Sequence, residues 1–261
     1  MRKALALQVL AALATAGSVY AAPEARLQVA QAPQHIAQAP TEGASRKGDA
    51  PVGAITYNAP LRGAPATRVG GGTRSAATKS VQLSVLAPSD TGYTTRDKPT
   101  IYWYVSEALQ KPVELTIINN ESLEAASKPV FALTLQPPVA RGVHALSLEQ
   151  HGVVLKPGVE YQWFVALVGD AEHRSNDVIA GGTIKRVVET DSVRSQVKQA
   201  SPASRPALYA SAGIWYDAID ELSKQISAQP ENRELRVQRA GLLEQVGLTE
   251  AAAFDRAALR Q

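Results

Sequence analysis

Between residues 81 and 188, short stretches of the chain alternate apolar and polar positions, which is the period of a strand with one buried face. Pro and Gly fall between these stretches and favour turns there. Within residues 100–105, Ile101, Trp103 and Val105 share one face and are candidate core residues. Repeated short strands of this kind are typical of an antiparallel sandwich. The seven predicted strands are residues 81–86, 100–105, 113–118, 130–135, 143–148, 161–168 and 183–188.

One local motif indicates which sandwich the strand region resembles. Leu155–Tyr161 has the spacing of a tyrosine corner, in which a tyrosine hydroxyl bonds to backbone a few residues upstream. Trp103 lies on the second strand, where fibronectin type III domains place a core tryptophan. Residues 79–189 therefore resemble a seven-stranded antiparallel β-sandwich of the fibronectin type III or immunoglobulin-like kind. A resemblance of this type supports a fold and carries no function.

After residue 189 the apolar spacing becomes that of a helix. Trp215, Ala218, Ile219, Leu222 and Ile226 lie at i, i+3, i+4, i+7 and i+11, which places them on one helical face. Gly and Pro divide the remainder into further short helices. We therefore predict a β + α two-part fold, in which the sandwich is followed by an α-helical tail over residues 190–261.

The tail contains an internal repeat with a period of 34 residues. This is the period of tetratricopeptide repeats, which are stacked helix–turn–helix units. The tail therefore resembles one and a half to two degenerate tetratricopeptide repeats. Because two repeats alone are marginally stable, we expect the tail to pack against the sandwich or against a partner. The matched pairs are Tyr209 and Leu243, Gly213 and Gly247, Ile214 and Leu248, and Ala218 and Ala252.

The first 78 residues carry neither pattern. Arg2 and Lys3 precede an apolar run at Ala4–Ala16, and small residues follow, so we interpret residues 1–22 as a secretory signal peptide. Residues 23–78 are rich in Ala, Pro, Gly, Gln and Thr, which predicts a disordered linker whose end docks on the first strand. We expect an exported protein, periplasmic or extracellular, with no transmembrane segment after signal removal.

Charge and cysteine content exclude some functions. Residues 1–80 hold nine Lys or Arg and three Asp or Glu, whereas residues 81–261 hold eighteen and twenty-one. The basic character thus belongs to the predicted linker rather than the folded body, and we expect no nucleic-acid partner. The chain has no cysteine, which excludes disulfides, thiolate nucleophiles and cysteine-based metal sites.

No spacing of residues indicates catalysis. His144 and His151 lie seven residues apart, which matches no metal-ligand pattern. The polar loop Gly169–Asp177 carries spaced oxygen ligands that a calcium site would need, but a solvated loop is the default interpretation. No nucleophile elbow is present, and no Ser-x-x-Lys pair lies in an apolar helical context. We therefore expect no enzyme, and no catalytic, cofactor or metal site.

The candidates for partner contact are aromatic residues and one acid. Trp215 shares the apolar helical face and is expected to be buried, whereas Tyr216 and Asp217 point elsewhere. They either attach the tail to the sandwich, which we favour, or face a partner. Tyr102 and Tyr104 alternate with the core face of the second strand, so we expect them to be exposed.

Several segments resemble the bacterial domain-of-unknown-function family 928, and their order and spacing match from about residue 60 to 248. The most specific is Ala207–Ile219, which contains Tyr-Ala-Ser-Ala-Gly-Ile-Trp-Tyr-Asp-Ala. The resemblance implies an exported protein of a kind common in cyanobacteria and some proteobacteria, with no established activity. The other segments are Gly70–Arg74, Lys98–Val105 and Tyr161–Phe164.

Three hypotheses follow for function. The first is a non-catalytic binding or adaptor protein of the cell envelope that docks on another envelope or exported protein. The second is a module for cell-wall or sheath polysaccharide, with Tyr102 and Tyr104 stacking on sugar rings. The third is a secreted hydrolase that uses acids scattered over the sandwich loops.

Overall fold

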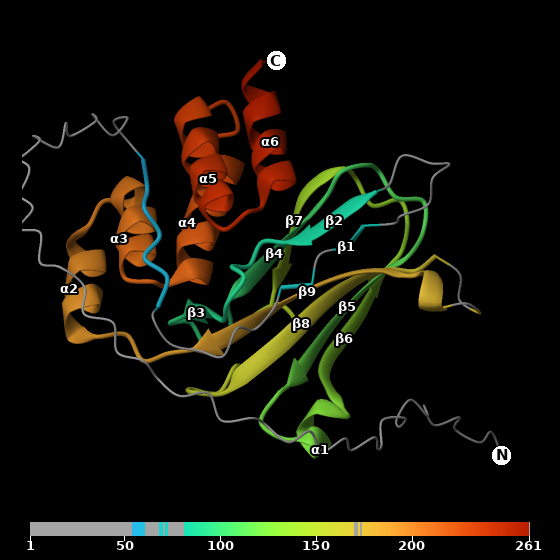
Figure 1. Cartoon of the computed structure of the whole chain (residues 1–261). Coiled ribbons are helices and arrows are strands. Elements are labelled where there is room, and N and C mark those ends of the chain that lie inside the picture. Colours follow the sequence, from blue (N-terminus) through green and yellow to red (C-terminus); the bar gives the residue numbers. More distant parts are fainter. Residues whose placement is uncertain are drawn as a thin grey trace, which may run out of the picture. The chain divides into compact units, whose positions relative to one another are not determined.

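The seven predicted strands all form, and they pack as two sheets (Figure 1). The computed structural model describes residues 54–60, 68–69, 71–72, 81–169, 172 and 174–260. One sheet has the order β1-β2-β4-β7 and the other has the order β3-β9-β8-β5-β6. The first consists of β1 (Gly71–Gly72), β2 (Gln82–Val85), β4 (Thr100–Val105) and β7 (Gly142–Ser147). The second consists of β3 (Gly92–Thr94), β9 (Val178–Arg186), β8 (Glu160–Leu167), β5 (Val113–Asn119) and β6 (Pro129–Leu135).

The prediction of seven antiparallel strands is wrong in strand number and in one pairing. The described residues contain two more strands, β1 and β3, and β3 runs parallel to β9. Neither carries an alternating apolar pattern, because β1 is two glycines and β3 is only three residues long. The pairing of β1 with β2 does confirm that this glycine segment docks on the first predicted strand.

The last strand is also longer than predicted, because β9 begins at Val178 and not at Thr183. The first part of β9 was not predicted because it contains glycines, and glycine usually weakens a strand. A Cβ on Gly182 would lie 2.7 Å from the Ala87 Cβ, and one on Gly181 would lie 2.5 Å from the Phe164 ring. The glycines therefore allow close packing on both faces of β9.

The core between the two sheets follows the predicted faces. Ile101, Trp103 and Val105 of β4 are buried, and Trp163 of β8 is buried in the opposite sheet. The tyrosine corner is confirmed, because the Lys156 backbone N–H donates to the Tyr161 hydroxyl at 3.2 Å.

The helices form two hairpins with the same turn geometry. Gly213 and Gly247 have φ angles of 76° and 73°, which favour glycine at the end of a helix. The residue after each glycine donates its N–H to the equivalent carbonyl, Tyr209 or Leu243, at 2.9 Å. These bonds confirm the 34-residue repeat as a structural equivalence. The helices are α1 (Leu123–Ala126), α2 (Asp191–Gln199), α3 (Arg205–Ser211), α4 (Trp215–Ala228), α5 (Arg233–Gln245) and α6 (Thr249–Ala257), with short 3-10 turns at Arg174–Asn176, Pro202–Ser204 and Ala258–Arg260.

The helical tail packs against the strands, on the face of β4 and β7 that points away from the other sheet (Figure 1). Helix α4 contacts β3 and β4, and α6 contacts β7. Consequently every residue of β4 from Ile101 to Val105 is buried, on both faces of the strand. The sheet is thus the middle layer of three.

Part of the predicted linker is also packed, so that prediction is wrong for the residues described within it. In residues 54–60, Ile55 is buried and the Asn58 N–H donates to the Ala210 carbonyl at 3.1 Å. The Tyr57 ring meets Trp215 edge-on at 4.9 Å between centroids. The predicted signal peptide and the start of the linker lie outside the described residues. Among those described, no helix is both long and apolar enough to cross a membrane.

Two Gly→Ala substitutions should have opposite effects on stability. The turn at Gly213 requires a positive φ, which a residue with a Cβ rarely adopts, and an added Cβ would lie 2.8 Å from the Asn58 carbonyl oxygen. Gly213→Ala should therefore lower the free energy of unfolding by about 1–3 kcal/mol. Gly241 lies inside α5 with open space at its Cβ position, so Gly241→Ala should raise it by about 0.5–1 kcal/mol. Urea denaturation of both variants measures the difference, and equal effects would contradict this account of the turn.

Candidate functional site

Tyr216 inserts from the first turn of α4 into the sandwich. Its hydroxyl accepts from the Trp163 indole N–H at 2.9 Å and donates to the Thr183 carbonyl at 2.9 Å. A Cβ on Gly92 would lie 2.5 Å from the Tyr216 ring, so β3 needs a glycine there. Burial raises the pKa of Tyr216 well above its ordinary value, and the hydroxyl stays protonated as a donor. This one side chain joins α4, β3, β8 and β9.

Asp217 fastens the same turn of α4 to the end of β3. One carboxylate oxygen accepts from the Thr94 hydroxyl at 2.5 Å. The other accepts from the backbone N–H and the hydroxyl of Thr95, at 3.1 and 2.5 Å. Asp217 is fully buried, so its carboxylate has lost its hydrating water. These three donors take the place of that water.

A second buried carboxylate, Asp220, lies one turn further along α4. It accepts from the Tyr102 hydroxyl at 2.8 Å and from the Lys224 ammonium at 2.7 Å, and it pairs with Arg96. Arg96 also donates to Glu221 at 2.6 Å. The outer face of β4 is therefore tied to α4 by a charged network.

The four predicted partner-contact residues are all buried within the chain. Tyr102 and Tyr104 are 6% and 3% exposed, so the expectation that they face solvent is wrong. The reason is that helices cover the outer face of β4, and the Tyr104 ring lies 5.5 Å from the Phe254 ring of α6. Tyr216 and Asp217 attach the tail to the sandwich, which is the alternative that the sequence favoured.

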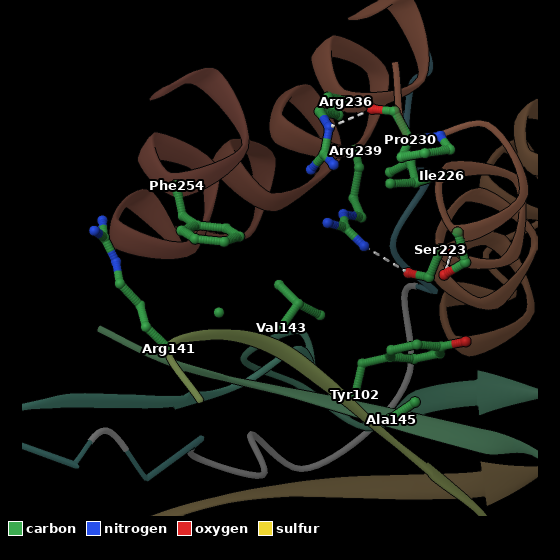
Figure 2. Close-up of a pocket in the computed structure, with 12 residues that line it drawn as sticks. Tyr102, Arg141, Val143, Ala145, Ser223, Ile226, Pro230, Arg236, Arg239 and Phe254 are labelled. Carbon is green, nitrogen blue, oxygen red and sulfur yellow. Dashed lines mark hydrogen bonds between the residues drawn. The ribbon is translucent and has the colours of Figure 1, made fainter. Parts of the chain in front are cut away.

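A cleft of about 310 Å³ remains between the sheet and the helices, and Figure 2 shows it in close-up. Strands β4 and β7 form its floor, and α4, α5 and α6 form its walls. We call it the arginine cleft, because three of its lining residues carry a guanidinium group. It is lined by Tyr102, Arg141, Gly142, Val143, Ala145, Ser223, Ile226, Ser227, Pro230, Arg236, Arg239 and Phe254.

Arg239 is buried at the wall of the cleft. Its guanidinium donates to both carboxylate oxygens of Asp255, at 2.7 and 2.6 Å, and to the Ser223 hydroxyl at 3.0 Å. Arg236, one turn earlier on α5, has Nη1 at 3.6 Å from Asp255 and donates through Nε to the Pro230 carbonyl at 3.4 Å. Asp255 thus holds both arginines in place from behind.

Arg141 and Phe254 form another side of the cleft, across from Arg239 (Figure 2). The Arg141 Cζ lies 5.5 Å from the Phe254 ring centroid, within the range of a cation–π contact. Burial raises the pKa of Tyr104, while the charge of Arg141 and a hydrogen bond from it act in the opposite direction. A Cβ on Gly142 would lie 3.0 Å from the Phe254 ring, so this glycine leaves room for the aromatic side chain.

The cleft lining has a restricted set of side-chain types. The side chains around it are arginine, serine, tyrosine and apolar groups, with no His, Asp, Glu, Lys or Cys among the lining residues. Elsewhere in the described part of the chain, no three His, Cys, Asp or Glu residues are placed to hold a metal ion. Of the loop that suggested calcium, Asp177 instead accepts from Arg174 and from the Gly169 N–H.

Sequence patterns did not indicate Arg141, Arg236, Arg239 or Phe254. One signal was present, because Leu235, Arg239 and Leu242 lie at i, i+4 and i+7. A charged residue inside an apolar stripe predicts a buried ion pair, since an unpaired charge is too costly to bury. Arg141 and Phe254 come from distant segments, and only the packing of α6 on β7 brings them together.

The sequence profile of the Domain of Unknown Function DUF928 matches residues 69–255. The chain belongs to the DUF928 family. The matched region of this DUF928 protein spans both sheets and includes every residue that lines the arginine cleft, from Tyr102 to Phe254, together with Asp255.

Other comparisons with the DUF928 chain add little. None of the curated proteins matches it. Among solved structures it is similar to a multi-domain immunophilin from Arabidopsis thaliana, at 10% identity, covering 70% of this chain and 95% of that one. The TM-score of 0.17 is too low for any argument about fold or function.

Asp217→Asn should destabilise the protein, whereas Asp191→Asn should not. An amide at position 217 would replace one acceptor oxygen by an N–H donor. That donor would face the donating hydroxyl of Thr94 or Thr95. We expect a loss of about 2–3 kcal/mol in the free energy of unfolding, since the site is buried. Asp191 lies in the equivalent first turn of α2 with its side chain 99% exposed, and its substitution should change stability by less than about 0.5 kcal/mol. Thermal or urea unfolding compares the two, and similar losses would contradict the role of Asp217.

Stability should fall as pH rises above 10, and Tyr102 should contribute to that fall. Burial raises the pKa of Tyr102 to about 12, from an ordinary value of 10.0. The raised pKa stabilises the folded state fully below pH 10, and this contribution is lost as pH rises toward 12. The slope reaches about 1.4 kcal/mol per pH unit for each such group. Tyr102→Phe should flatten the dependence of unfolding free energy on pH in this range, and an unchanged slope would contradict the assignment.

Proposed function

We propose that this DUF928 protein is an exported, non-catalytic binding protein of the bacterial cell envelope, and that the arginine cleft is its binding site. The observation that carries the proposal is that both parts of the chain form the walls of the cleft. Strands supply Tyr102 and Val143, while helices supply Ser223, Arg236 and Phe254. A site made by two packed parts explains why the tail is fastened to the sandwich by buried polar groups.

The composition of the cleft supports binding over catalysis. General acid–base catalysis needs a group that changes protonation near neutral pH, and arginine and tyrosine do not. The Ser223 hydroxyl accepts from Arg239, and the lining holds no His, Asp, Glu or Lys that could act as a base on it. Bidentate arginine pairs are suited to holding oxyanions and to shaping a site.

We also propose that the two parts are a fibronectin type III-like sandwich and a degenerate pair of tetratricopeptide-like repeats. The tyrosine corner supports the first assignment. The equivalent turns at Gly213 and Gly247 support the second. A pair of repeats lacks the neighbours that normally cover it, and β4 takes their place.

The polysaccharide alternative loses the residues on which it rested, because Tyr102 and Tyr104 are buried. The predicted signal peptide, which begins with Arg2 and Lys3, supports an address outside the cytoplasm, so the bound molecule is expected in the envelope. It is either part of another exported protein or a smaller component of that compartment, and a covalent crosslink distinguishes the two by mass.

Photo-crosslinking in intact cells tests the proposed function. Photo-reactive benzoyl-phenylalanine replaces Ala145, which is exposed and lines the cleft, or Ala132, which is equally exposed on β6. Position 145 should yield an adduct in the periplasmic or secreted fraction, on a chain that has lost its first 22 residues. Position 132 should yield little. No adduct from position 145, or a full-length chain retained in the cytoplasm, would refute the proposal.

A further inference from the structure

The arginine cleft has an excess of positive charge. Arg141, Arg236 and Arg239 line it, and no carboxylate does. The carboxylate that pairs with Arg239 and Arg236 is Asp255, which is fully buried behind Arg239. The lining itself therefore carries three positive charges and no negative charge, so the space between these residues favours an anion.

The guanidinium groups differ in how many donors are already used. Arg239 directs three N–H groups to Asp255 and Ser223, so its role is to hold α4, α5 and α6 together. Among described residues, the hydrogen bond assigned to Arg236 is the long one from Nε to Pro230, at 3.4 Å. The Nη donors of Arg236 are therefore available to a ligand, although its side chain is only 19% exposed.

The position of Arg236 is fixed before any ligand arrives. Asp255 lies 3.6 Å from its Nη1, and Asp255 is itself locked by the bidentate pair with Arg239. A partly buried and preorganised guanidinium binds an oxyanion more strongly than a solvated one, because less order is lost on binding. Arg141 adds a second positive group beside Phe254.

The rest of the lining is apolar and limits the size of the ligand. Val143, Ile226, Pro230 and the ring of Phe254 surround the charged groups. The volume of about 310 Å³ equals that of roughly ten water molecules and lies at the small end of ligand pockets. A small molecule with one charged end and one apolar end matches this surface.

We propose that the arginine cleft binds a small organic anion, with its carboxylate or phosphate group on Arg236 and an apolar portion on Phe254, Val143 and Ile226, while Arg141 adds positive charge to the cleft lining. This inference rests on the proposed function of the cleft as a binding site. It adds the chemical class of the ligand. The anion completes a charge balance that Asp255 alone leaves unfilled.

Calorimetric titration of the purified full chain tests the inference with four matched probes: phenyl phosphate, benzoate, benzyl alcohol and benzylamine. Phenyl phosphate or benzoate should bind at least about tenfold more tightly than benzyl alcohol, and benzylamine should not bind measurably. The stronger of the two anions identifies phosphate or carboxylate as the preferred group. Binding should weaken as salt is raised, because the attraction is electrostatic.

Variants locate the binding. Arg236→Gln should weaken binding of the anion by about tenfold or more, and Arg141→Gln should weaken binding to a lesser extent. Arg194→Gln serves as the control, since this arginine is on α2, 57% exposed and away from the cleft lining. Thermal unfolding shows whether each variant is folded, and Arg141→Gln, which alters an exposed residue, keeps the test valid if Arg236→Gln is not.

The outcomes separate this inference from the proposed function. The inference would be overturned if the anions bound no more tightly than benzyl alcohol. It would also be overturned if Arg194→Gln weakened anion binding as much as Arg236→Gln did. A crosslink from position 145 in cells would then still support a binding site for an uncharged ligand. Anion binding in vitro without any crosslink in cells would support the inference and count against the envelope role.

Discussion

The burial of β4 on both faces is the constraint on which the rest of the structure depends. Its inner face packs into the sandwich through Trp103, while its outer face carries Tyr102 and Tyr104 under the helices. A tyrosine buried in this way needs a partner for its hydroxyl, and Asp220 supplies one. A buried Asp220 in turn needs cations, which Arg96 and Lys224 provide. Each buried polar group thus requires the next, and together they fix α4 on the sheet.

The arginine cleft is the place where this packing stops. Helix α4 lies close to β3 and β4 near its start, where Tyr216 and Asp217 are buried. Towards its end, Ser227 is exposed and the space between the layers opens. The Arg239–Asp255 pair, which is buried, holds α5 to α6 along this opening. The same polar chemistry therefore serves to close one end of the layer interface and to line the other.

Sequence patterns predicted the features that follow from local periodicity. They missed the features that arise when one layer of the structure packs on another. The face of Ile101, Trp103 and Val105 was correct, because alternation identifies one buried face. It cannot show whether the other face meets water or a further layer, since tyrosine suits both environments. Tyr102 and Tyr104 were therefore placed in solvent wrongly. Strand β3 was missed for a related reason, because its pairing with β9 joins residues far apart in sequence.

The cleft itself was beyond sequence reasoning, apart from the charge that Arg239 places in an apolar stripe. Arg141 and Phe254 become neighbours only after the sandwich and the tail have packed.

The buried contacts of Tyr216 and Asp217 also affect the order of folding. The donors from Thr94 and Thr95 lie 123 and 122 residues before Asp217, and Trp163 lies 53 residues before Tyr216. During synthesis, the ribosome releases β3 and β4 long before α4 exists to cover them. Contacts with such separations form slowly, because a long loop must close first. The outer face of β4, with Tyr102 and Tyr104, therefore stays uncovered until the helices that begin at Trp215 have been made.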